Sequence, residues 1–214
     1  MARLLSSARA SLSTSVSTRL AHQAALPVSR HTPCGYFGSR ALSSGCATCF
    51  ASLAPQPPMS VAQQQALGLG PRKHGSLEVH MIPSIYDNYI FVLRETGANK
   101  VAVVDPSEDE PVSRFVHDRG LGKIDAILNT HHHYDHTNGN DALKREFGCV
   151  VHGASADSHR IPGLDVALGE GSTFTFGDAP VEVLECHGHT VGHILFHFPE
   201  HKVAFVGDTI FVVG

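Results

Sequence analysis

The first 77 residues of this 214-residue sequence contain no aspartate or glutamate, and all 20 acidic residues lie from Glu78 onward. That later part carries nine Lys and Arg residues against those 20 acids, a formal charge of −11. Because affinity for nucleic acid comes from basic surface, we expect no nucleic-acid partner. The sequence also lacks any apolar run near the roughly 18 residues that span a bilayer, so we expect no membrane partner.

The acid-free segment 1–58 has the composition of an organelle transit peptide. It is rich in Ser and Ala, lacks the continuous apolar core of a secretory signal, and has arginines at loose intervals, namely Arg3, Arg9, Arg19, Arg30 and Arg40. We predict a disordered leader that targets the mitochondrial matrix, with the plastid as the second choice. Initiation at Met59 would give a cytoplasmic form, and a basic tail without a targeting role is the alternative.

Cysteine is scarce, with five residues in the chain. The pair Cys46 and Cys49 matches C-x-x-C, but it lies in the leader, without the strand-to-helix context of a redox motif. Cys149 and Cys186 give no disulfide framework, which is typical of a reducing compartment.

One α/β domain is expected over residues 77–214, after a Gln-, Gly- and Pro-rich linker at 59–76. Helical spacing predicts helices over 110–122 and 138–148, the second ending at Gly148. Short β-rich runs are expected at 76–95 (two runs), 100–107, 124–130, 149–153, 172–176, 181–186, 194–198 and 202–208. Paired strands and strand-helix-strand units together indicate the α/β class.

The stretch "THHHYDHTNGN" at 130–140 places four histidines and one aspartate within six positions. His131 and His133, two residues apart, lie on one side of an extended loop, whereas a helix would separate them by about 200°. Asp135 and His136 follow at the turn. Imidazole and carboxylate groups favour zinc, iron or manganese, and a bound cation would hold such crowded donors together. The alternative is a solvated polar loop that is histidine-rich by chance.

Three stretches together resemble the metallo-β-lactamase fold. "THHHYDH" is similar to the T-H-x-H-x-D-H signature, "GHTVGH" at 188–193 to G-H-T-x-G-H, and "VGDTIF" at 206–211 to the later G-D-T/A element. Within that superfamily the stretches "YDNYIFVL", "VAVVDPS" and "GDTIFVVG" resemble the glyoxalase II family, the hydroxyacylglutathione hydrolases. The resemblance covers roughly 77–214 and implies an αββα sandwich that is incomplete at the C-terminus.

The family pattern implies a site for two divalent metal ions, with zinc expected before iron or manganese. Carried over by position, His131, His133 and His189 hold one ion. Asp135 and His136 hold the second ion, Asp208 bridges the pair, and Asp135 is a candidate for handling the proton of the attacking water.

Several residues near these motifs are expected not to bind metal. His132 would fill the loop, and His193 would be a buried packing residue beside the site. Cys186 and His187 stand where the family usually has Pro-Gly or Pro-Cys. We expect Cys186 to be a small core side chain, and a thiolate that ligates zinc is the alternative. Four further histidines are expected on strands or at the surface, namely His152, His159, His197 and His201.

The resemblance implies hydrolysis of S-D-lactoylglutathione to glutathione and D-lactate in methylglyoxal detoxification. The partner would be a small-molecule glutathione thioester. The family continues beyond the equivalent of Gly214 with another metal-binding histidine and glutathione-binding residues, so we expect a truncated form that binds metal weakly. A mononuclear iron persulfide dioxygenase of the same fold and an inactive metal-binding remnant are the alternatives.

Overall fold

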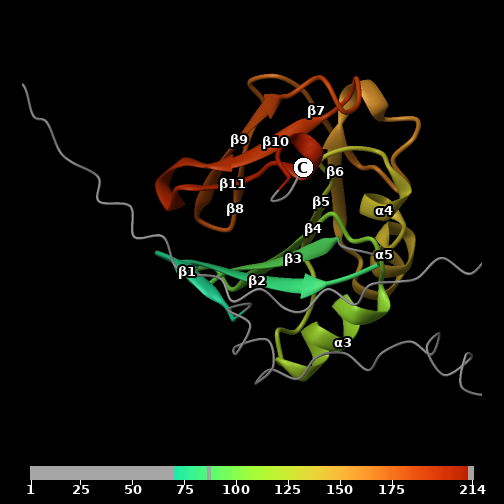
Figure 1. The fold of residues 1–214 in the computed structure, drawn as a ribbon. Coiled ribbons are helices and arrows are strands. Elements are labelled where there is room, and N and C mark those ends of the chain that lie inside the picture. The colour runs from blue at the N-terminus through green and yellow to red at the C-terminus, as the bar shows by residue number, and fades with distance from the viewer. Residues whose placement is uncertain (1–69, 86–87, 212–214) are drawn as a thin grey trace, which may run out of the picture. The chain divides into compact units, whose positions relative to one another are not determined.

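The computed structural model describes residues 70–85 and 88–211. The predicted transit peptide, Met59, the C-x-x-C pair and most of the predicted linker lie outside the described residues. Within the described residues, the strands form two β-sheets and three α-helices lie between strands of the larger sheet, which confirms the α/β prediction (Figure 1).

The larger sheet has seven strands in the same order in space as in the sequence. They are β1 (Arg72–His74), β2 (Leu77–Pro83), β3 (Tyr89–Glu95), β4 (Lys100–Val104), β5 (Ala126–Leu128), β6 (Val150–Ala154) and β7 (Val166–Leu168). Strands β1 to β4 are antiparallel, whereas β4 to β7 are parallel.

The smaller sheet is antiparallel, with spatial order β11-β10-β9-β8. Its strands are β8 (Thr173–Phe176), β9 (Ala179–Glu185), β10 (Ile194–Phe198) and β11 (Val203–Phe205). Alternate residues of β10 are buried, because one face of this strand packs into the core and the other does not.

The α-helices all lie between β4 and β6 in the described part of the chain. They are α3 (Glu110–Asp118), α4 (Tyr134–Thr137) and α5 (Asn140–Phe147), with short 3-10 turns η2 (Ser155–Asp157), η3 (Pro199–His201) and η4 (Gly207–Thr209). Both long helices were predicted. Helix α5 ends at Gly148, whose φ of +67° suits a residue without a Cβ.

Two apolar cores lie on the two faces of the seven-stranded sheet. One fills the space between the sheets, with Leu93, Leu128, Val183, Phe196 and Phe198 among its members. The other packs helices α3 and α5 on the opposite face through residues that include Val103, Val112, Ile127 and Leu143. Figure 1 shows this order of layers, helices, large sheet and small sheet. The residues of β4 after Lys100 are buried because both faces of the sheet are covered.

Among the strands and α-helices, three elements were not predicted from the sequence. Arg72–His74, inside the predicted linker, form β1, because their backbone pairs with β2 although their side chains are polar. Strand β7 was not predicted, since its three residues are too short to show a pattern. The predicted turn at Asp135 and His136 is one turn of helix, α4.

No helix in the described residues is long and apolar enough to cross a membrane. Cys149 and Cys186 are free thiols, as expected. Cys149 is buried, but Cys186 is only half-buried, so the prediction of a core side chain is wrong for Cys186. It follows β9 directly, at the point where the chain leaves the sheet.

Candidate metal centre

The histidine loop begins at the carboxyl end of β5, in the middle of the larger sheet. Thr130 and His131 are fully buried there. The backbone N–H of Thr130 donates to Asp105 Oδ1 at 2.8 Å, and its hydroxyl donates to Asp105 Oδ2 at 2.7 Å. Asp105 follows β4 and Thr130 follows β5. Because these two strands are adjacent and parallel, both residues lie at the same edge of the sheet.

The bond between Thr130 and Asp105 determines which nitrogen of His131 is free. Because the Thr130 hydroxyl proton is used on Asp105, its Oγ1 can only accept from His131 Nδ1, 3.1 Å away. His131 Nε2 is then unprotonated and faces His133 Nδ1 at 3.1 Å. Neutral imidazole with its lone pair directed outward is the form that binds metal.

The smaller sheet contributes its residues through two loops. The loop between β9 and β10 carries His189, and it is tied to the histidine loop where the Ile194 N–H donates to the Thr130 carbonyl at 2.9 Å. Turn η4, after β11, carries Asp208. The backbone N–H of Asp208 donates to Nε2 of the fully buried His193 at 3.2 Å. The prediction that His193 is buried beside the site is therefore confirmed.

Gly207 lets η4 approach the histidine loop closely. Its φ is +47°, in the left-handed region. A Cβ at this position would lie 2.4 Å from Thr130 Oγ1 and 2.8 Å from His193 Nε2. Because Gly207 has no side chain, turn η4 can lie against Thr130 and His193, and this close approach places Asp208 at the site.

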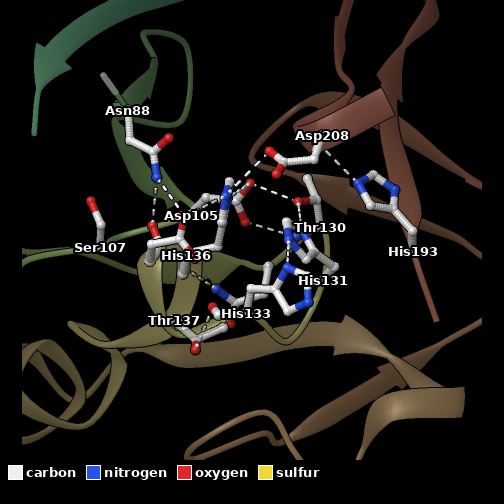
Figure 2. Close-up of polar contacts among 12 residues, drawn as sticks. Asn88, Asp105, Ser107, Thr130, His131, His133, His136, Thr137, His193 and Asp208 are labelled. Atoms are coloured by element: carbon white, nitrogen blue, oxygen red, sulfur yellow. Dashed lines mark hydrogen bonds and ion pairs between the residues drawn. The ribbon is translucent and has the colours of Figure 1, made fainter. Parts of the chain in front are cut away.

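The structure brings five of the six predicted ligands into two groups of potential ligand atoms, and the sixth, Asp135, lies beside the second group. His189 Nε2 lies 2.9 Å from His133 Nδ1, and with His131 these residues form one group whose potential ligand atoms are all within 4.8 Å of one another. A second group contains His131, His136 and Asp208. Figure 2 shows the labelled members, His131, His133, His136 and Asp208, gathered at the ends of the surrounding elements.

Asp208 belongs to the second group and also contacts His189 of the first group. Its Oδ1 is 3.2 Å from His136 Nε2, and its Oδ2 is 3.2 Å from His189 Nε2. Asp135 is farther out, with Oδ2 3.6 Å from His136 Nε2, and Asn88 Nδ2 donates to that oxygen at 2.9 Å. The positions of both carboxylates are compatible with the predicted division into two metal positions.

Burial favours the neutral form of two imidazoles of the first group, His131 and His133. It is the largest cause that lowers the pKa of His131, and the neighbouring His136 adds to it. Burial, followed by His189, also lowers the pKa of His133. Burial alone would lower the pKa of His136, but the hydrogen bond and charge of Asp105, with Asp208 and Asp135, outweigh it and raise that pKa.

The donor set fits divalent cations. Nε2 of His136 is buried and makes no hydrogen bond within residues 70–85 and 88–211, yet it faces two carboxylates. A buried polar atom without a hydrogen bond is costly unless another partner, such as a cation, satisfies it. Nitrogen and carboxylate oxygen donors suit zinc, iron or manganese.

Neither Cys186 nor the remaining histidines of the described residues belong to the two groups of potential ligand atoms. His132 Nδ1 contacts Asp157 Oδ2 at 2.7 Å instead of the site. The exposed His187 contacts the Val191 carbonyl at 2.6 Å and Glu185 at 3.2 Å. Strand residues His152 and His197, exposed His159 and His201 in η3 belong to neither group, as predicted.

Three residues that organise the site were not recognised in the sequence, namely Asn88, Asp105 and Asp157. One local feature of the sequence indicates Asp105, which is an acidic residue directly after a buried strand. No local feature indicates Asn88 or Asp157, because their partners Asp135 and His132 are distant in sequence.

A cavity of about 740 Å³ opens beside the second group. Its lining includes the polar residues Asn88, Asp105, His136 and Asp208 and apolar residues such as Met81 and Phe91. This size and mixture are typical of sites that bind small molecules.

Comparison with known proteins agrees with this geometry. Over 138 residues the chain is 46% identical to hydroxyacylglutathione hydrolase from Methylococcus capsulatus and 44% identical to hydroxyacylglutathione hydrolase from Ruegeria pomeroyi. Each alignment covers 64% of this chain and 54% of the relative, so the chain spans about half the length of these curated relatives.

The fold is also found among solved structures. The B3 metallo-beta-lactamase BLEG-1 matches with a TM-score of 0.55 and 24% sequence identity, over 62% of this chain and 73% of that chain. The family model described as "Metallo-beta-lactamase superfamily" matches residues 86–214, more than half of the sequence. With the two-sheet fold and the convergent ligands, this match shows that the chain belongs to the metallo-beta-lactamase superfamily.

Proposed function

We propose that this protein is a metal-dependent thioester hydrolase that converts S-D-lactoylglutathione to glutathione and D-lactate. The observation that carries the proposal is the convergence of six ligand-type side chains beside a cavity of about 740 Å³. Identity of 46% to a hydroxyacylglutathione hydrolase supports the choice of substrate. The reaction would belong to methylglyoxal detoxification.

His131, His133 and His189 would hold one divalent cation, most simply zinc. His136 and Asp135 would hold the second, with Asp208 between the two positions. Such cations supply Lewis acidity toward a thioester carbonyl and lower the pKa of a water molecule toward neutrality.

Asp135 is the residue placed to move a proton. Its Oδ2 accepts a hydrogen bond from Asn88 Nδ2 at 2.9 Å, which orients the carboxylate toward His136. We assign to this carboxylate the role of accepting the proton of the attacking water. The leaving thiolate is stable without protonation, so the reaction does not require a strong general acid.

The test combines metal analysis with thioester hydrolysis by the full chain. We expect zinc-loaded protein to hydrolyse S-D-lactoylglutathione, and Asp208→Ala to lower kcat/KM by about 100-fold or more. Asp118→Ala, which removes an exposed carboxylate at the end of α3, serves as the matched control and should match the unsubstituted chain. Hydrolysis that is unchanged by Asp208→Ala, or no hydrolysis by the metal-loaded chain, would overturn the proposal.

The alternative of a mononuclear iron persulfide dioxygenase makes a different prediction. It would use His131, His133 and an aspartate to hold iron, leave the second metal position unused, and release sulfite from a persulfide substrate. His136 Nε2 is buried between two carboxylates and makes no hydrogen bond within the described residues, which favours a second cation and therefore the hydrolase.

We propose that residues 1–58 direct the protein to the mitochondrial matrix, on the basis of their arginine-rich, acid-free composition. A fluorescent protein fused after residue 58 should enter mitochondria. Residues 59–214 fused to the same fluorescent protein should stay in the cytosol.

A further inference from the structure

His132 points away from the cluster formed by the residues on either side of it. Because successive side chains of an extended segment alternate in direction, the side chain between His131 and His133 lies on the back of the loop. Its Nδ1 lies 2.7 Å from Asp157 Oδ2. The Asp157 side chain is only 5% exposed, so the contact is made in the interior.

Asp157 is firmly held at the end of η2, immediately beyond β6. Its carbonyl accepts the backbone N–H groups of Arg160 at 2.8 Å and Ile161 at 3.2 Å. The Arg160 guanidinium also lies 3.3 Å from His132 Nε2. A guanidinium can only donate, so His132 Nε2 accepts, and the Nδ1–H of His132 is directed to Asp157.

The same carboxylate contacts the second ligand loop. A Cβ added to Gly192 would lie 2.3 Å from Asp157 Oδ2 and 2.4 Å from Asp157 Cγ. The backbone of the loop that carries His189 therefore passes directly against Asp157. This contact accounts for the second glycine of "GHTVGH", where any side chain would displace the carboxylate.

We propose that Asp157 is a positioning residue that holds the His131/His133 loop and the His189 loop at the spacing required by one cation. One carboxylate oxygen is bonded to the first loop and packs against the backbone of the second. Asp157 belongs to neither group of potential ligand atoms, so it acts through His132 and Gly192. The inference rests on the metal centre of the proposed function and is independent of the thioester substrate.

The test is a zinc titration of the full chain against a chromophoric chelator, with folding followed by circular dichroism. Asp157→Ala should raise the zinc concentration for half-saturation by about 10- to 100-fold, the usual effect of losing a residue that orients ligands. Asp157→Asn keeps an oxygen that can accept from His132 and should recover most of this loss. A residue needed only for folding would lower stability without changing the affinity of the folded molecules.

Asp165→Ala is the matched control. Asp165 accepts the Val151 N–H at 2.9 Å and pairs with Lys144 at 2.6 Å, so this variant loses similar bonds away from the ligand loops. Its zinc affinity should equal that of the unsubstituted chain.

Gly192→Ala keeps the proposal testable if Asp157→Ala does not fold. The added methyl group would clash with the Asp157 carboxylate, which is still present in this variant. Zinc binding should therefore be weaker than in the unsubstituted chain, as in Asp157→Ala. Unchanged zinc affinity in folded Asp157→Ala, or in Gly192→Ala when the first variant does not fold, would overturn the proposal. A chain that binds zinc but does not hydrolyse the thioester would overturn only the proposed function.

Discussion

Two hydrogen bonds join Thr130 to Asp105, one from the backbone N–H at 2.8 Å and one from the hydroxyl at 2.7 Å. Both residues are buried, and Asp105 has a φ of +49°, which is unusual for a residue other than glycine. Asp105 Oδ2 also lies 3.2 Å from His136 Nδ1. A single carboxylate therefore orients one member of each ligand group, His131 through Thr130 and His136 directly.

Thr130→Val tests this orientation. Valine keeps the shape but removes the hydroxyl that accepts from His131 Nδ1, so the protonation pattern of that imidazole is no longer controlled. We expect zinc affinity to fall by about 10-fold or more. Thr130→Ser retains the hydroxyl and should bind zinc nearly as the unsubstituted chain does. Equal affinities for the valine and serine variants would contradict the assigned orientation.

Gly207→Ala tests the close approach of η4. The new methyl group would contact Thr130 and His193, and the left-handed backbone adds further cost, so unfolding free energy should fall by about 2 kcal/mol or more. Gly171→Ala is the matched control, since its φ is +70° but nothing lies within 4 Å of a Cβ there. Urea denaturation should show the larger loss for Gly207→Ala, and only this variant should lose bound zinc.

Phe196→Ala tests the core between the sheets. The side chain is fully buried on β10, so truncation should lower the unfolding free energy by about 3–5 kcal/mol. Val191→Ala, at a side chain 79% exposed, should change it by less than about 0.5 kcal/mol. A loss for Phe196→Ala no greater than for Val191→Ala would show that this packing is wrong.

His80 should make stability depend on pH. Burial, followed by the charge of Arg119, lowers the pKa of His80 below its ordinary value of 6.5. The unfolded chain therefore binds the proton more readily, and the contribution of His80 to stability is complete above pH 6.5 and declines as the pH falls toward the lowered pKa. Urea denaturation at pH 8 and about pH 5.5 would measure this decline.

In His80→Gln the glutamine is uncharged at both pH values. The fall in unfolding free energy from pH 8 to about pH 5.5 should therefore be about 1 kcal/mol smaller than in the unsubstituted chain. The exposed His159→Gln provides the comparison, and its loss should equal that of the unsubstituted chain. Equal losses in all three proteins, at the same metal content, would exclude this role for His80.

Local patterns in the sequence predicted most of the elements. Apolar spacing identified α3 and α5, and Gly148 marked the end of α5, because these signals depend on neighbours within a few residues. Strands β1 and β7 were not recognised, since three-residue strands are defined by their partners and not by their own composition.

Local spacing was enough to identify the candidate ligands, because "THHHYDH", "GHTVGH" and "GDT" keep their donors at fixed separations along the chain. The residues that orient these ligands became visible in the folded chain alone. Asp105, Asn88 and Asp157 reach the site from β4, from the start of β3 and from η2, through contacts between residues 25 to 47 positions apart. Contacts at such separation depend on how strands pair and sheets stack, and no short-range pattern encodes that arrangement.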